Sequence, residues 1–183
     1  MSEKVVLTKY NNSWYKPGNT FKCLLWYFTN VIFLKNGLNP SSKIKVLALK
    51  CFGAKIGRGV VLKPGVSIKY PWFLEIGNYV WIGENVWIDN LATVKIADNV
   101  CVSQGAMLLC GNHNYKKESF DLIVESIVLE EGSWVGARSI VGPGVVLHSH
   151  AILAVNSVAN KNLESYYIYQ GNPAVKTRRR TIG

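Results

Sequence analysis

One aliphatic residue recurs at every sixth position through most of the chain. Five triads follow one another, and every step inside a triad is six: Ile56, Leu62, Ile68; Ile76, Ile82, Ile88; Ile96, Val102, Leu108; Leu129, Val135, Val141; Leu147, Leu153, Ala159. An amphipathic helix has a period of about 3.6 and a flat strand a period of about 2, so neither explains the pattern. Short strands that meet at corners do explain it, and six-residue repeats are typical of parallel β-helices.

The residues between the repeat positions fit such a fold. A repeat residue is often followed by glycine and a polar residue, as in Ile56-Gly57-Arg58, which suits a tight corner. Three repeats would make one triangular turn of roughly 18 residues, so the fifteen repeats predict about five stacked coils. We therefore predict an all-β fold with a parallel β-helix over residues 56–163.

The repeat is interrupted at regular places. The step is eight from Ile68 to Ile76 and from Ile88 to Ile96, and it is 21 from Leu108 to Leu129. A loop over residues 109–128 is therefore expected to leave the β-helix. Insertions in repeat proteins collect on one face, which is commonly the binding face.

The motifs around this loop resemble a known family. The repeats, the loop with its histidine after the third coil, and the ending Gly171-Asn172-Pro173-Ala174 are similar to left-handed β-helix acyltransferases, in the branch of the maltose, galactoside and nodulation acetyltransferases. The chain resembles the colanic-acid-type acetyltransferases of exopolysaccharide gene clusters more closely, in residues 52–57, 69–72, 81–91 and 103–105. The resemblance covers about residues 20–178. It implies acetyl-CoA-dependent O-acetyl transfer to a sugar hydroxyl in exopolysaccharide or lipopolysaccharide biosynthesis.

The two ends of the chain lie outside the repeat, as an extension with amphipathic helices over residues 1–55 and a basic extension over residues 164–183. Only 12 residues separate Lys22 from Lys35 in the first apolar run, and a membrane span needs about 20. The run also lies too far from Met1, and lacks the cleavage site, for a signal peptide. We expect it to pack on the β-helix. Peripheral contact with a membrane is the alternative, favoured by four lysines: Lys35, Lys43, Lys45 and Lys50.

Cysteine usage and charge limit the compartment and the partners. The four cysteines have no Cys-x-x-Cys spacing, which favours free thiols in a reducing cytoplasm, with the inner face of the membrane as the alternative location. The net charge of +10 indicates an anionic partner. The basic tail with Lys176 and Arg178 would suit nucleic acid, but the tryptophans fall at repeat-phased positions that favour packing. Given the resemblance, we expect coenzyme A as the anion and no nucleic acid.

Three histidines are present, and one lies in the insertion. His148 and His150 form a His-x-His pair without a third ligand nearby, so no metal is expected. In the acetyltransferases that this chain resembles, the histidine at the position of His113 is the general base. It removes the proton of the acceptor hydroxyl as that oxygen attacks the thioester. Because no acyl-enzyme is required, Cys110 is interpreted as a packing residue.

Short polar side chains near the insertion are the candidates for acceptor binding. Asp89 and Asn90 stand where the second two-residue insertion begins, and Asn85 occupies a corner, although these residue types also form turns without any function. Asn112 and Tyr115 flank the histidine. A resembling enzyme uses the neighbourhood of Asp89 for sugar hydroxyls, which favours a sugar or nucleotide-sugar acceptor.

The resemblance to the maltose-type enzymes also implies a coenzyme A site. Its residues would be Ala137, Val155, Asn160, Lys161 and Arg178. Backbone groups of the first two would hold the pantetheine arm, and the last two would contact phosphates. The chain departs from that family in having Ala137 and Asn160 where Ser and Thr are common, and Val175 where a further basic residue is common. Lys176 or Arg179 are therefore alternatives for the phosphates.

A cleft beside one loop of a β-helix is closed on one side only, so a second copy is expected to supply the other wall. The resemblance implies a homotrimer with sites between the subunits. Two alternative functions stay open. One is a serine- or antibiotic-type O-acetyltransferase on the same scaffold, and the other is a non-enzymatic β-helix scaffold.

Overall fold

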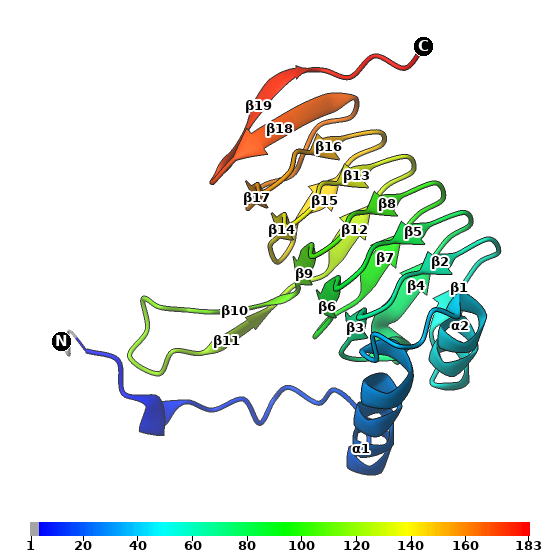
Figure 1. Ribbon diagram of the computed structural model, residues 1–183. Helices are drawn as coiled ribbons and strands as arrows, with labels where there is room; N and C mark the ends of the chain where they lie inside the picture. The colour runs from blue at the N-terminus through cyan, green and yellow to red at the C-terminus, as the bar shows by residue number, and fades with distance from the viewer. Residues whose placement is uncertain (1–3) are drawn as a thin grey trace.

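The chain winds into a triangular β-helix whose three faces are sheets (Figure 1). The computed structural model describes residues 4–183. Sheet A contains β1 (Lys55–Ile56), β4 (Leu74–Ile76), β7 (Val94–Ile96), β12 (Ile127–Leu129) and β15 (Val146–Leu147). Sheet B contains β2 (Val61–Leu62), β5 (Trp81–Ile82), β8 (Cys101–Val102), β13 (Trp134–Val135), β16 (Ile152–Leu153), β18 (Tyr167–Gly171) and β19 (Ala174–Arg179). Sheet C contains β3 (Ser67–Ile68), β6 (Trp87–Asp89), β9 (Met107–Leu109), β14 (Ile140–Val141) and β17 (Val158–Ala159).

The register of the strands confirms the six-residue repeat. In sheet A, Ile76 pairs with Ile56 on one side and with Ile96 on the other, and the repeat residues of sheets B and C form equivalent columns. All fifteen repeat residues are at most 9% exposed. Burial of these aliphatic columns therefore stabilises the left-handed β-helix, in which each coil packs on the coils next to it.

Five complete coils are followed by part of a sixth. Leu163 forms a bridge with Leu147 of sheet A, and β18 pairs with β16 so that Tyr169 continues the column of Leu153. The chain then reverses into β19, which runs antiparallel to β18. The first part of the segment predicted as a C-terminal extension, residues 164–183, thus belongs to the stack of coils. The repeat did not reveal this, because the step from Ala159 to Leu163 is four residues instead of six.

The corners of the prism differ in length, and we name them by the sheets that they join. The B–C corner is short in every coil and consists of residues 63–66, 83–86, 103–106, 136–139 and 154–157. The C–A corner consists of residues 69–73, 90–93, 110–126, 142–145 and 160–162. All three interruptions of the repeat therefore fall on the C–A corner, as the spacing predicted. The longest forms a hairpin of β10 (Gly111–His113) and β11 (Leu122–Val124).

Helices cover the first coil. Helix α1 (Thr20–Thr29) continues into the π-helical turn η2 (Asn30–Leu34), and α2 (Ser42–Cys51) follows. The side chains of Asn19 and Ser41 cap α1 and α2 by accepting backbone N–H groups. Trp26 is buried and donates its indole N–H to the carbonyl of Ile68, 2.9 Å away. None of the helices within residues 4–183 has the length and hydrophobicity needed to cross a bilayer.

An N-terminal arm, residues 4–19, runs beside the hairpin and leads into α1 (Figure 1). It contains the short helix η1 (Leu7–Lys9), and a second short helix, η3 (Pro71–Phe73), lies on the C–A corner. The backbone N–H of Val6 donates to the carbonyl of Glu118 in the hairpin, and Lys9 forms an ion pair with the same residue at 2.7 Å. The arm is therefore bound to the hairpin near its start and joins helix α1 at its end.

Candidate active site

A cavity of about 460 Å³ opens at the C–A corner beside the hairpin. Three parts of the chain line it. The arm contributes Tyr10, Asn12, Tyr15 and Pro17, the first two coils contribute Lys69, Tyr70, Asp89 and Leu91, and the hairpin contributes Gly111, His113 and Leu122. Of the residues predicted from the sequence to form the site, this cavity brings together His113 and Asp89.

His113 is held in one orientation by contacts around its ring. Its Nδ1 lies 3.0 Å from the carbonyl oxygen of Phe120, and the two rings stack at 4.4 Å with an angle of 7°. The ring of Tyr10 of the arm also lies close to it, with ring centroids 5.7 Å apart and an angle of 54°. Because a carbonyl oxygen can only accept, this contact assigns the proton to Nδ1 and leaves Nε2 with a free lone pair. A half-buried imidazole in this tautomer can act as a general base.

Asp89 and Asn90 are adjacent in sequence but have different roles. The ammonium group of Lys69 lies 2.9 Å from Asp89 Oδ1, at angles outside those of a hydrogen bond, and both side chains border the cavity. Asn90, in contrast, is fully buried. Its amide accepts from the N–H of Tyr70 at 3.0 Å and donates to the carbonyl of Tyr70 at 2.6 Å. The prediction that Asn90 binds the acceptor is corrected, since its amide is used to hold the wall of the cavity.

The arm supplies cavity residues that were missed in the sequence. The hydroxyl of Tyr15 donates to the carbonyl of Leu91 at 2.7 Å, and Trp72 donates its indole N–H to the carbonyl of Pro17 at 2.6 Å. Burial, with the nearby Tyr70 and Asp89, raises the pKa of Tyr15, so it stays a neutral hydrogen-bonding phenol. Residues 4–19 have no periodic pattern, and the signal in the sequence was limited to a few aromatic residues in a polar segment.

The other residues near the hairpin lie outside this cavity. Asn112 accepts the N–H of His113 and faces a separate hollow shared with Glu125 and Asn160. Tyr115 is 72% exposed in the loop between β10 and β11. Cys110 is buried, and burial raises its pKa to about 11, so the thiol is protonated and unsuited to nucleophilic attack near neutral pH.

The histidines outside the hairpin have separate partners. Nδ1 of His148 lies 3.1 Å from Glu130, and the ring of His150 stacks on Tyr166 at 4.7 Å. Among residues 4–183, no three His, Cys, Asp or Glu side chains gather in a group that could hold a metal ion.

The predicted site residues divide between two corners of the prism. The B–C corner carries Asn85, Ala137 and Val155. The C–A corner carries the cavity with His113 and Asp89. Two coils above the hairpin, the same C–A corner carries Asn160 and Lys161, outside the cavity. Arg178 is exposed on β19, at the end of sheet B. From Ala137 to Gly142 the chain advances five residues across sheet C, about 16 Å at ~3.3 Å per residue. Within one chain, the predicted residues of the B–C corner therefore lie apart from His113 and Asp89.

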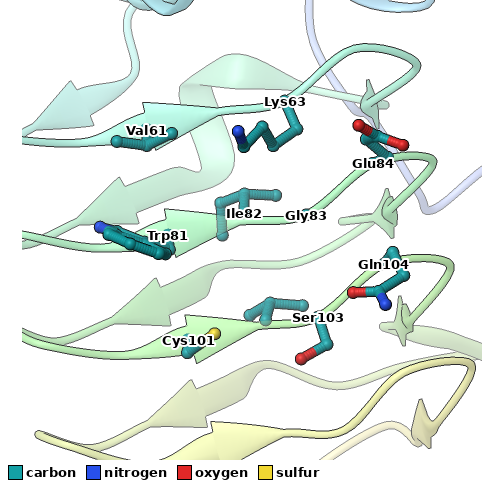
Figure 2. A pocket seen from close by; sticks show the side chains of 10 residues that line it. Val61, Lys63, Trp81, Ile82, Gly83, Glu84, Cys101, Ser103 and Gln104 are labelled. Atoms are coloured by element: carbon teal, nitrogen blue, oxygen red, sulfur yellow. The ribbon is translucent and has the colours of Figure 1, made fainter.

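A second hollow, of about 360 Å³, lies on sheet B beside the B–C corner (Figure 2). Trp81 and Cys101 border it on the strands, and Lys63, Glu84 and Gln104 border it from the turns. The outward-facing tryptophans of sheets B and C are well exposed, with Trp81 at 61% and Trp87 and Trp134 at 43%. These faces are apolar enough to pack against another protein surface.

Comparisons with known proteins agree with the fold and the repeat. No protein-family model matches the chain. WcaF of Escherichia coli K12, named for colanic acid biosynthesis and as an acetyltransferase, is 31% identical over 166 residues, which cover 91% of each chain. The galactoside O-acetyltransferase of the same strain is 23% identical over 123 residues, 66% of this chain and 61% of its own.

Solved structures share the β-helix. A galactoside acetyltransferase in complex with coenzyme A superposes with a TM-score of 0.78 at 21% identity, over 88% of this chain and 82% of that one. A hexapeptide-repeat acetyltransferase of Vibrio cholerae, complexed with acetyl coenzyme A, gives 0.73 at 20% identity, over 80% and 81% of the two chains. The match to WcaF spans nine tenths of both chains at 31% identity, and this chain therefore belongs to the hexapeptide-repeat acetyltransferases, with WcaF as a relative.

Proposed function

We propose that the chain transfers the acetyl group of acetyl-CoA to a sugar hydroxyl during exopolysaccharide or lipopolysaccharide assembly, with His113 as general base. The observation that carries the proposal is that His113 lines a cavity with polar walls while its Nδ1 contacts the carbonyl of Phe120. It leaves Nε2 as the proton acceptor at the place where an acceptor hydroxyl would enter. The name of WcaF favours a polysaccharide acceptor.

The reaction needs one proton shuttle and no covalent enzyme intermediate. Nε2 of His113 removes the hydroxyl proton while the oxygen attacks the thioester carbonyl, and the tetrahedral intermediate then expels the coenzyme A thiolate. The imidazolium returns the proton to that sulfur, so the enzyme ends in its starting state. The raised pKa of Cys110 supports direct transfer over an acyl-cysteine route.

Polar groups around His113 are suited to a sugar. Asp89 can accept hydrogen bonds from sugar hydroxyls, and the phenols of Tyr10 and Tyr15 offer the flat apolar surface with a polar edge on which sugar rings pack. Asn112 and Tyr115 would contribute only if the loop between β10 and β11 closes over the acceptor. Asn85 would reach an acceptor only from the B–C corner of another copy.

The donor site is proposed to lie between subunits of a homotrimer. Ala137 and Val155 would hold the pantetheine arm at the B–C corner of one copy, and a neighbour would bring its C–A corner with His113 to the thioester. Asn160, Lys161 and Arg178 would contact the phosphate end. The separation of the two corners within one chain supports this assembly, and the exposed tryptophans of sheets B and C supply surface for it. We place the reaction in the cytoplasm, where acetyl-CoA is available.

Binding of coenzyme A tests the proposal directly. Saturating coenzyme A is expected to raise the Tm of the purified protein, and the rise should shrink at high ionic strength because the contacts are charged. Arg178→Glu should increase the KM for acetyl-CoA with little change in the KM for the acceptor. Lys95→Glu, an exposed lysine of sheet A with the same charge change, is the control. Absence of any coenzyme A shift in the wild-type protein would reject the proposed function.

A further inference from the structure

The N-terminal helices turn a large apolar surface to solvent. Between Phe21 and Leu47, eleven large hydrophobic side chains are 40% or more exposed, including Phe21 at 74% and Leu38 at 91%. Monomeric soluble proteins rarely expose contiguous apolar patches of more than a few hundred Å². This part of the surface is therefore expected to have a partner.

The exposed side of α1 and η2 is as apolar as the buried side, unlike that of an ordinary surface helix. The buried side consists of Trp26, Asn30 and Leu34, at helical spacing, and includes a polar residue. The exposed side carries Phe21, Leu24, Leu25, Phe28 and Ile32, and each of these has another of the set three or four residues away. We call these five side chains the apolar face of α1. A surface helix normally has charged and polar residues at such positions.

Charge indicates what the partner is. Residues 4–74 contain 12 Lys and Arg and no Asp or Glu, a net charge of +12, whereas residues 75–183 contain 9 basic and 10 acidic residues, a net charge of −1. Lys35, Lys43 and Lys50 are exposed on or beside the helices. An apolar face among lysines fits a bilayer with acidic headgroups. A second copy that met this face with its own would bring the exposed lysines of the two copies close together, and their repulsion disfavours that pairing.

The helix has the length to lie on a membrane rather than to cross it. Thr20 to Leu34 is 15 residues, or roughly 22 Å, and the hydrocarbon core of a bilayer is about 30 Å thick. Lys35, which follows η2, can extend its ammonium group to the headgroups while the apolar face enters the acyl boundary.

The apolar face of α1 is connected rigidly to the His113 cavity. Pro17 lines the cavity and Thr20 begins α1, so the chain between them spans at most about 10 Å. Trp72 fixes this junction, since its indole donates to the carbonyl of Pro17 at 2.6 Å and the ammonium of Lys22 lies 4.4 Å from its ring centroid. A helix held at the membrane would therefore hold the cavity wall there too.

We propose that α1, η2 and α2 dock the protein on an anionic bilayer, with the apolar face of α1 in the headgroup–acyl boundary and the His113 cavity beside the headgroups. A second step rests on the proposed function. A cavity held at that level selects an acceptor sugar carried on a membrane lipid over one carried on a soluble nucleotide.

Vesicle flotation tests the docking. The full chain is expected to float with vesicles of phosphatidylcholine containing about 30% phosphatidylglycerol, to float less with phosphatidylcholine alone, and to be released by salt. Leu25→Gln with Phe28→Gln changes two exposed residues and should weaken the partitioning by at least roughly tenfold. Val175→Gln with Ile182→Gln, at residues 61% and 59% exposed in the C-terminal segment, is the matched control and should bind as the wild type does.

Three results would overturn the docking. These are wild-type protein that does not float with anionic vesicles, a double variant that binds them equally well, and a double variant that instead changes its sedimentation coefficient, which would assign the face to contacts between copies. None of them depends on acetyl transfer, and the Tm rise with coenzyme A, measured on the same variants, reports on the proposed function separately.

Labelled acetyl-CoA tests the acceptor. With a membrane and cytosol extract of the source organism, we expect label in the fraction extracted by organic solvent, and its loss in the Leu25→Gln, Phe28→Gln variant, whose coenzyme A shift should stay normal. Label confined to the water-soluble fraction would overturn the choice of a lipid-carried acceptor.

Discussion

The coils and the C–A corner are held together in different ways. In the coils each repeat residue is buried in a column and paired in a sheet, so that one coil specifies the next. At the C–A corner the hairpin and the arm are held by a few polar contacts, such as the ion pair of Lys9 with Glu118 and the hydrogen bond from Tyr15 to Leu91. The repeated part supplies stability, and the proposed chemistry lies in the part that departs from the repeat.

The difference predicts that substitutions will separate stability from activity. Replacing a buried repeat residue should lower the free energy of unfolding and leave the turnover of the folded protein nearly unchanged. A change in the cavity should affect the reaction and leave the fold intact. The most informative variants are therefore those that compare the two regions directly.

His113→Ala is expected to have the largest effect on turnover. Removing the general base should lower kcat by roughly 10²–10⁴-fold. The loss of its stacking on Phe120 should cost only about 0.5–1.5 kcal/mol of the free energy of unfolding. Steady-state kinetics and a thermal melt measure the two quantities, and His148→Ala, on the surface of a different coil, is the control. Turnover near the wild-type value in His113→Ala would contradict the assignment of the base.

Leu108→Ala is expected to have the opposite profile. Leu108 is fully buried and pairs with Ile88 and Val141 in the column of sheet C. Its truncation should lower the free energy of unfolding by about 2–5 kcal/mol, because a cavity is left between coils. The remaining folded protein should keep a KM for acetyl-CoA close to normal. Denaturant titration measures the stability, and a loss below about 1 kcal/mol would mean that the coils can collapse around the gap.

Asp89→Asn and Asn90→Ala compare the two regions at neighbouring positions. Loss of the charged acceptor in Asp89→Asn should lower kcat/KM for the acceptor by roughly 10- to 100-fold while the Tm hardly moves. Asn90→Ala should instead lower the Tm, since two backbone groups of Tyr70 lose their buried partner. Equal effects of the two variants on the acceptor KM would contradict the separation of their roles.

The sequence predicted the fold further than it predicted the site. The six-residue period specified the strands, the faces and the corner with the insertions, because each coil repeats the same local geometry. It did not predict the partial sixth coil, where Leu163 arrives two residues early. The resemblance predicted His113, and the structure places it in the cavity. The cavity walls formed by Tyr10 and Tyr15 depend on an arm without periodicity, whose position is determined by contacts with the hairpin and coils. Asn90 could not be distinguished from Asp89, because burial of a side chain at a corner is not visible in its residue type.

Replacement of Cys110 is expected to have the smallest effect on turnover. It is the first residue of the insertion but is buried and contacts the carbonyl of Ala92 at 3.8 Å, so in packing it belongs to the coils. Burial disfavours its thiolate and raises the pKa to about 11, so the reactive form appears only as the pH approaches that value.

At pH 7.5 iodoacetamide should label the exposed Cys51 first and Cys110 hardly at all, as peptide mass spectrometry would measure. Cys110→Ala should keep kcat within about twofold and lower the free energy of unfolding by about 1 kcal/mol, the typical cost of a small truncation. An acetylated Cys110 isolated after mixing with acetyl-CoA, or loss of turnover in Cys110→Ala, would move this residue from the packed coils to the chemistry of the corner and replace direct transfer by an acyl-enzyme mechanism.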